Sequence, residues 1–176
     1  MVTDMNGLTH LYYGDGKGKT TAAVGLALRA AGQGMQVIFA QFFKTMPTGE
    51  IAMLKELGVT VLRADLPAGF TWNMTEEELA EIREKHDALL QNAFAAISGE
   101  KTLLILDECV DAYAYGYLNK ELMLSCCRER CGSVELALTG HCAPEEIVSF
   151  CDYVTEMKAV RHPYEKGITA RRGIEF

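Results

Sequence analysis

Short apolar runs alternate along the chain with segments that have the composition and end signals of helices. The apolar runs predict strands, some buried on both faces, over Thr9–Tyr13, Met35–Phe43, Val59–Leu62, Thr102–Leu106 and Val134–Thr139. The segments between them predict helices over Thr20–Ala31, Gly49–Leu57, Thr75–Ile97 and Pro144–Phe150. This alternation predicts an α/β fold with a mainly parallel sheet flanked by helices.

Two of the helix boundaries are marked by specific residues. Gly32 ends the first helix, and Thr75 with Glu78 three residues later forms a capping box that begins the longest one. Ligands of parallel sheets bind at the carboxyl ends of the strands. The polar residues that follow each strand are therefore the candidates for function.

A glycine-rich turn joins the first predicted strand to the first predicted helix. Its glycines allow backbone N–H groups to converge on one point, where the helix adds its positive N-terminal end. Lys19 can place an ammonium group on phosphate oxygens, and the Thr20 hydroxyl can bind Mg²⁺. We predict a P-loop NTPase-like three-layer fold whose phosphate loop binds ATP through Gly14, Asp15, Gly16, Lys17, Gly18, Lys19, Thr20 and Thr21.

This phosphate loop is one residue shorter than the usual pattern. Three residues rather than four separate Gly14 from Gly18, and Tyr13 stands where a glycine is expected. The strand before the loop and the helix after it nevertheless provide the context that phosphate binding requires.

An acidic pair, Asp107 and Glu108, ends the fourth predicted strand. Carboxylates at the end of a buried strand can hold Mg²⁺ or its water ligands beside a phosphate loop. We predict a magnesium site at Thr20, Asp107 and Glu108, with Glu108 the better candidate for direct contact. The alternative is a solvated strand end. Lys19 and Glu108 are the predicted catalytic residues.

Length and charge limit the possible classes of function. A chain of 176 residues has the size of one domain, which we expect to span residues 1–176. The net charge of −7 argues against a broad basic surface for nucleic acid or an anionic membrane. With neither a signal-peptide pattern nor a bilayer-length apolar run, the sequence predicts a cytoplasmic protein.

The chain has six cysteines, and none of them form a CxxC pair. Reduced, partly buried thiols are the favoured interpretation, and a zinc site is the alternative.

Several further strings follow the phosphate loop in a fixed order: Gly69-Phe70-Thr71-Trp72, Leu106-Asp107-Glu108, Leu138-Thr139-Gly140, Ala143-Pro144-Glu145-Glu146, Val154-Thr155-Glu156-Met157, His162-Pro163 and Gly173-Ile174-Glu175. Together with the phosphate loop, these strings resemble the ATP:corrinoid adenosyltransferases. The resemblance extends from about residue 8 to the C-terminus, and its specificity comes from the combination rather than from one string.

The resemblance implies transfer of the 5′-deoxyadenosyl group of ATP to Co(I) of cobalamin or a related corrinoid. Inorganic triphosphate would be released, in adenosylcobalamin biosynthesis or salvage. A phosphate loop with Mg²⁺ suits this reaction because it stabilises charge on the departing polyphosphate without a protein nucleophile. The resemblance also implies a reduced corrinoid as substrate, an electron donor such as a reduced flavoprotein, and a homodimer.

Phe70 and Trp72 match aromatic positions that face the corrin ring in this family. An apolar wall that excludes water would favour four-coordinate cobalt and make reduction to Co(I) accessible. Considered without the resemblance, both residues would be assigned to ordinary core packing.

Two features depart from the family pattern. His141 stands where an arginine is expected after Thr139-Gly140, so a phosphate contact there competes with a structural or solvated histidine. The N-terminal segment that covers the site in some members is short here. The basic stretch Lys158–Arg172 is expected to be a solvated surface.

Two other functions compete with the adenosyltransferase. Lys19, Thr20 and Asp107 alone would also suit a P-loop kinase or ATPase. A nonenzymatic nucleotide-binding module or corrinoid carrier is the third possibility. Neither alternative accounts for the ordered strings after the phosphate loop.

Overall fold

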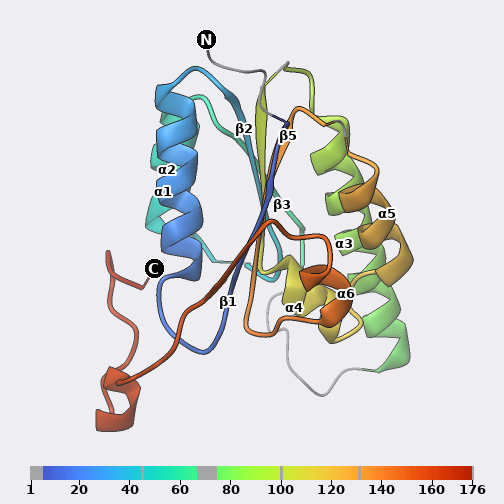
Figure 1. Cartoon of the computed structure of the whole chain (residues 1–176). Helices are drawn as coiled ribbons and strands as arrows, with labels where there is room; N and C mark the ends of the chain where they lie inside the picture. The colour runs from blue at the N-terminus through green and yellow to red at the C-terminus, as the bar shows by residue number, and fades with distance from the viewer. Residues whose placement is uncertain (1–5, 45, 67–74, 100, 131, 176) are drawn as a thin grey trace.

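The computed structural model describes residues 6–44, 46–66, 75–99, 101–130 and 132–175. Its centre is a six-stranded sheet in the order β3-β2-β4-β5-β1-β6 (Figure 1). All of the described strand pairs are parallel, which confirms the predicted sheet. The strands are β1 (Thr9–Tyr13), β2 (Gln36–Gln41), β3 (Thr60–Arg63), β4 (Thr102–Asp107), β5 (Val134–Gly140) and β6 (Tyr153–Glu156).

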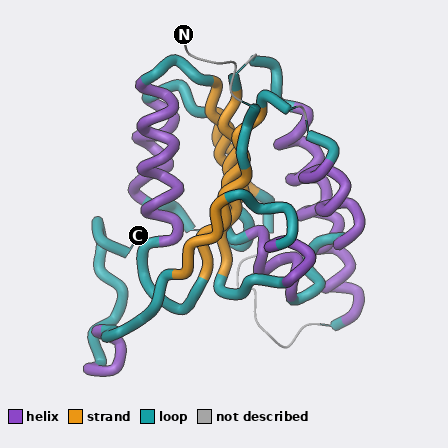
Figure 2. The backbone as a smooth tube through the Cα atoms, viewed as in Figure 1, coloured by secondary structure: helices purple, strands orange, loops and turns teal. Residues whose placement is uncertain are grey.

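Helices cover both faces of the sheet, as Figures 1 and 2 show, so the predicted three-layer α/β arrangement is confirmed. One face carries α1 (Lys19–Gly32) and α2 (Gly49–Glu56). The other carries α3 (Glu76–Ala95), α4 (Cys109–Ala114), α5 (Lys120–Arg128) and α6 (Glu145–Val148). A 3₁₀ turn, Pro163–Lys166, lies in the C-terminal segment beyond β6.

The sheet is stabilised by apolar side chains on both of its faces. Every residue of β4 is buried, as expected for a central strand between two helical layers. On one face, α1 approaches closely through Ala23, Ala27 and Ala30, which share one side of the helix. On the other, α3 contributes larger side chains such as Ile82 and Leu90. Burial of each Leu or Ile contributes about 1.5–3 kcal/mol.

The five predicted strands and four predicted helices are confirmed, with small shifts at their ends. The capping box of α3 is present, because the Thr75 side chain accepts from the Glu78 backbone while Glu78 accepts from Thr75. The sequence analysis did not predict α4, α5 or β6. Five of the six α4 residues are buried, which erases the amphipathic pattern, and all four β6 residues are exposed, so β6 lacks an apolar run.

Among the described residues, no helix is both long and apolar enough to cross a bilayer. The described cysteines are free thiols, namely Cys109, Cys126, Cys127, Cys142 and Cys151. Burial raises the pKa of Cys127 to about 12 and that of Cys151 to about 11, so both thiols are largely protonated at neutral pH.

The strand order brings the predicted functional segments together. Because β5 pairs with both β1 and β4, only one strand separates the phosphate loop after β1 from the acidic pair at the end of β4. On its other side, β4 pairs with β2. The segments that follow these four strands therefore meet at one edge of the sheet, the lower edge in Figure 1.

Candidate functional site

The phosphate loop needs glycine for two physical reasons. Gly14 and Gly18 have φ of 114° and 122°, a region that other residues rarely adopt. A Cβ atom on Gly14 would lie 2.4 Å from the backbone oxygen of Met157, and one on Gly16 would lie 2.7 Å from the same oxygen. These glycines therefore permit both the turn and the close approach of the segment after β6.

Backbone hydrogen bonds hold this loop from two sides. The Gly16 N–H donates to the Met157 carbonyl at 2.7 Å, and the Gly14 N–H donates to the His141 carbonyl at 3.1 Å. The Asp15 carboxylate accepts from the Ala159 N–H at 3.1 Å, so this predicted ATP-binding side chain fastens the loop to the C-terminal segment. The loop conformation thus depends on residues far away in the sequence.

Lys19 folds back over the phosphate loop. Its ammonium group donates to the carbonyl oxygens of Gly14 at 2.7 Å and Gly16 at 2.9 Å. Burial lowers the pKa of Lys19, and the surrounding carboxylates, Asp111 foremost, oppose that shift. The positive charge of the Lys19 ammonium group therefore lies directly at the phosphate loop.

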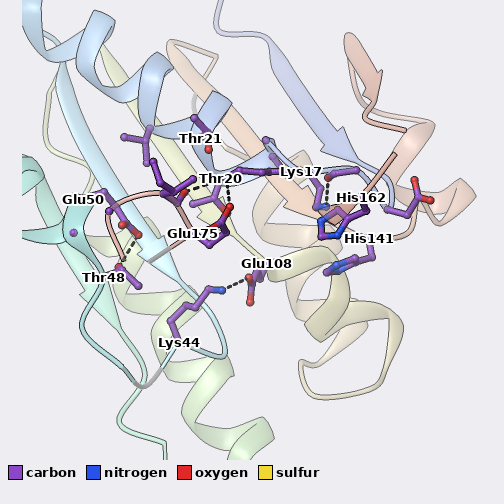
Figure 3. Close-up of a pocket in the computed structure, with 18 residues that line it drawn as sticks. Lys17, Thr20, Thr21, Lys44, Thr48, Glu50, Glu108, His141, His162 and Glu175 are labelled. Atoms are coloured by element: carbon purple, nitrogen blue, oxygen red, sulfur yellow. Dashed lines mark hydrogen bonds and ion pairs between the residues drawn. The ribbon is translucent and has the colours of Figure 1, made fainter. Parts of the chain in front are cut away.

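A cavity of about 580 Å³ opens beside the loop (Figure 3). Seven of the eight predicted loop residues line it, all except Gly14. Glu108 lies across the cavity from the loop, and further walls come from the segments after β2 and β5 and from the C-terminal segment. The described lining residues are Asp15, Gly16, Lys17, Gly18, Lys19, Thr20, Thr21, Val24, Lys44, Thr48, Gly49, Glu50, Glu108, His141, His162, Gly173, Ile174 and Glu175.

Asp107 is fully buried at the end of β4 and is surrounded by hydrogen-bond donors. Thr20 donates to its Oδ1 at 3.0 Å and Thr139 donates to the same oxygen at 2.8 Å, while Gln41 donates to Oδ2 at 3.1 Å. Burial raises the pKa of Asp107 and these hydrogen bonds oppose the rise. The network connects the phosphate loop to β4 through the intervening strand β5.

Glu108 forms an ion pair with Lys44, a residue that the sequence analysis did not select. The Lys44 ammonium lies 2.7 Å from Glu108 Oε1, and Figure 3 shows the two side chains pointing toward each other. Burial disfavours the charged form of Lys44, but the adjacent Glu108 carboxylate outweighs it and raises the pKa of Lys44. Burial also raises the pKa of Glu108, and Lys44 only partly offsets this.

Both sides of this ion pair adjoin left-handed backbone. Phe43, directly before Lys44, has φ of 57°, and Glu108 itself has φ of 62°. Such conformations cost on the order of 1–3 kcal/mol in residues other than glycine, and they cluster at functional sites. The strain therefore supports a functional role for this side of the cavity.

The residues predicted to hold Mg²⁺ fit that ion only with help from a ligand. Thr20 and Glu108 line the cavity, whereas Asp107 lies behind Thr20, within hydrogen-bond reach of its hydroxyl. The described residues contain no group of three or more His, Cys, Asp or Glu side chains that could hold a metal ion. Hydroxyl and carboxylate oxygens suit Mg²⁺, which commonly keeps several waters and shares phosphate oxygens.

His141 lies at the end of β5, on the rim of the cavity. Its Nδ1 lies 2.8 Å from Asp111 Oδ2, and its backbone N–H donates to Asp111 Oδ1 at 2.8 Å. Asp111 is nearly buried on α4. The imidazole is thus fixed through Nδ1, although most of the His141 side chain is exposed. Phe70 and Trp72, the predicted corrinoid wall, lie outside the described residues.

Comparison with known proteins agrees with this geometry. Residues 5–176 match the family described as ATP:corrinoid adenosyltransferase BtuR/CobO/CobP. The chain belongs to this family of adenosyltransferases. It is 34% identical to the corrinoid adenosyltransferase of Escherichia coli K12, in an alignment that covers 98% of this chain and 87% of the relative. Its identity to the Pseudomonas aeruginosa enzyme is 33%, over 98% of this chain and 85% of the relative.

A solved structure shares the fold of this adenosyltransferase. ATPases 2 and 3 of EssC from Geobacillus thermodenitrificans match it with a TM-score of 0.53 and 14% sequence identity. The match covers 98% of this chain and 36% of the EssC chain. At this identity the match concerns the fold alone, and it agrees with the P-loop-like arrangement.

Several residues of this adenosyltransferase site were not selected from the sequence. Lys44 and Thr139 lie at strand ends, so the rule that selected Asp107 could have found them. Asp111 lies three residues after Glu108, on the short helix that was not predicted. The stretch Lys158–Arg172, expected to be a solvated surface, is mostly exposed, although its His162 lines the cavity. Residues 173–175 line the cavity as well, and the Ile174 carbonyl accepts from Lys17 at 3.0 Å.

Proposed function

We propose that this protein transfers the 5′-deoxyadenosyl group of ATP to Co(I) of cobalamin or a related corrinoid and releases inorganic triphosphate. The observation that carries the proposal is the cavity beside the phosphate loop, in a chain of the adenosyltransferase family. Lys19 and loop N–H groups other than those of Gly14 and Gly16, which donate to His141 and Met157, would bind the polyphosphate. They would stabilise the negative charge that grows on it as the bond to the 5′-carbon breaks.

Mg²⁺ would be held by Thr20 and Glu108 together with phosphate oxygens and water, and it would supply further positive charge to the leaving triphosphate. Asp107 would not bind the ion directly but would orient the Thr20 hydroxyl, which donates to it at 3.0 Å. When Mg²⁺ binds, Lys44 would either give up its ion pair with Glu108 or share the Glu108 carboxylate with the metal ion. In this arrangement the nucleophile is the reduced cobalt of the substrate, so the protein needs none of its own.

Co(I) must be generated for this reaction, so the proposal includes an electron donor such as a reduced flavoprotein. It also includes a homodimer and a cytoplasmic location. The oligomeric state can be measured by analytical ultracentrifugation of the purified chain. A sedimentation coefficient for a 19.4 kDa species at micromolar concentration would contradict the dimer.

Incubation of the purified protein with MgATP and chemically reduced Co(I)alamin is expected to give light-sensitive adenosylcobalamin and stoichiometric triphosphate. A P-loop kinase or ATPase is the second candidate, because Lys19, Thr20 and Asp107 are assembled as such an enzyme requires. Product analysis separates the two candidates. ADP and phosphate without adenosylcobalamin would replace the proposed reaction with the second one.

We expect Trp72→Ala to impair the reaction more with Co(II)alamin and a mild reductant than with prereduced Co(I)alamin. An apolar wall at Trp72 would promote loss of the lower axial ligand, and that step is needed only when cobalt is still to be reduced. Parallel rate measurements with the two substrates check this. Equal losses in both assays would remove Trp72 from that role.

A further inference from the structure

The cavity contains more negative than positive fixed charge for a site that binds a polyanion. Three lysines line it among the described residues, Lys17, Lys19 and Lys44, and four carboxylates face them, Asp15, Glu50, Glu108 and Glu175. Lys44 is already paired with Glu108. A bound polyphosphate would therefore gain from a further cation, and only two histidines among the described lining residues could provide one.

These two histidines, His141 and His162, differ in what holds their Nδ1 atoms. His141 Nδ1 lies 2.8 Å from an Asp111 carboxylate oxygen, so it carries a proton and donates. His162 Nδ1 accepts from the Tyr164 N–H at 3.3 Å, so it carries no proton. The Nδ1 atom of His141 is thus held by a carboxylate, whereas that of His162 is held by a backbone N–H.

The fixed Nδ1 also determines where the opposite side of the His141 ring points. His141 lines both the main cavity and a second hollow of about 540 Å³ on the other side of the phosphate loop. Its backbone carbonyl accepts from Gly14, which ties the residue to the loop itself. Figure 3 shows the ring projecting beside His162 at the loop side of the cavity. With Nδ1 occupied by Asp111, Nε2 is the ring atom that can reach a ligand.

We propose that His141, protonated and backed by Asp111, donates from Nε2 to the bound polyphosphate and makes its affinity depend on pH. This inference rests on the proposed function, since it names one contact within that site. Histidine is the side chain whose charge ordinarily changes between pH 5 and 8. Asp111 on α4 contacts His141 directly. The other charged groups and histidines that line a cavity together with His141 are Asp15, Lys17, Lys19, Lys44, Glu50, Glu108, Glu156, Lys158, His162 and Glu175.

Binding of inorganic triphosphate in metal-free buffer tests this contact without ATP or corrinoid. We expect His141→Ala to weaken binding about 10- to 100-fold at pH 6, the range for a hydrogen bond between charged groups. At pH 8.5 the loss should fall below about 3-fold, because histidine side chains ordinarily change charge between pH 5 and 8. Because triphosphate itself titrates, the quantity to compare is the ratio of wild-type to variant affinity at each pH.

Four further variants make the result specific. His141→Gln should behave like His141→Ala, and His141→Arg should bind tightly at both pH values because its charge is permanent. His10→Ala is the matched control, since His10 is also paired with a carboxylate, Glu135, but lies outside the cavity. His162→Ala tests the other cavity histidine. His10→Ala should leave the triphosphate affinity unchanged at both pH values, and His162→Ala should weaken it less than His141→Ala does.

Equal triphosphate affinity of the wild type and His141→Ala at pH 6 would overturn the proposal, as would a loss caused by His162→Ala instead. A ring ¹⁵N spectrum gives an independent readout: in the triphosphate complex at pH 6, the His141 signals should be those of an imidazolium. Signals of a neutral ring in that complex would also contradict the contact. Absence of adenosylcobalamin in the enzyme assay, with these binding results intact, would refute the proposed function and leave the triphosphate contact standing.

Discussion

Lys19→Ala is expected to lower the turnover of adenosylcobalamin formation on the order of 10²-fold or more. The ammonium group lies over the phosphate loop, held by the Gly14 and Gly16 carbonyls, where the leaving triphosphate would develop its charge. Steady-state kinetics with MgATP and prereduced Co(I)alamin measure the effect. Near-wild-type turnover would exclude Lys19 from charge stabilisation.

Lys19 also contributes two hydrogen bonds to the loop, so charge and loop shape must be separated. Lys19→Gln keeps a side-chain donor for the carbonyls but removes the charge, and it should lose nearly as much activity as Lys19→Ala. Lys55→Ala, on the exposed side of α2, removes a lysine charge far from the loop and should retain wild-type turnover. Activity retained only in Lys19→Gln would assign the residue to loop shape instead.

Gly14→Ala is expected to damage both the stability and the activity of the protein. The new Cβ would meet the Met157 carbonyl oxygen at 2.4 Å, in a residue whose φ of 114° already disfavours alanine. A strained conformation costs on the order of 1–3 kcal/mol, which should lower Tm by roughly 2–10 °C. Displacement of the loop by about 1 Å should cost about 10²-fold in adenosylation rate.

Gly25→Ala provides the matched control for this substitution. Gly25 lies within α1, and apart from its chain neighbours and the backbone of the helix itself, no atom lies within 4 Å of a Cβ added there. Alanine in a helix interior is more stable than glycine by roughly 0.5–1 kcal/mol, so Tm should rise and the rate should not change. Calorimetry gives Tm for both variants, and the adenosylation assay gives their rates. A Gly14→Ala protein with unchanged Tm and rate would show that Met157 does not restrain the loop.

Most of the correct predictions came from residues that lie close together in the sequence. Gly14, Gly18 and Lys19 lie close together in the sequence, so the prediction of a strand, a turn and a helix was enough to place the phosphate loop. Asp107 and Glu108 followed from the rule that ligand sites lie at the ends of parallel strands. Both predictions needed only the alternation of strands and helices.

Tertiary contacts account for what the sequence did not show. Lys44 reaches Glu108 because β2 pairs with β4, and Asp111 reaches His141 because α4 packs on β5; the sequence alone specifies neither pairing. The exposed strand β6 carried no apolar signal, although it leads directly to Met157. The assignment of Phe70 and Trp72 to the corrinoid stays a prediction.

The hydrogen bond between Gly16 and Met157 has a consequence for the order of folding. The loop lies near the start of the chain, but β1 pairs only with β5 and β6, strands more than 120 residues further along. Contacts between such distant segments form slowly because long loops must close first. We therefore expect the phosphate loop to be synthesised before β5 and β6, which hold it, and to be among the last segments to reach its final shape. Pulsed hydrogen exchange during refolding should show the Gly16 amide protected after the amides of β4.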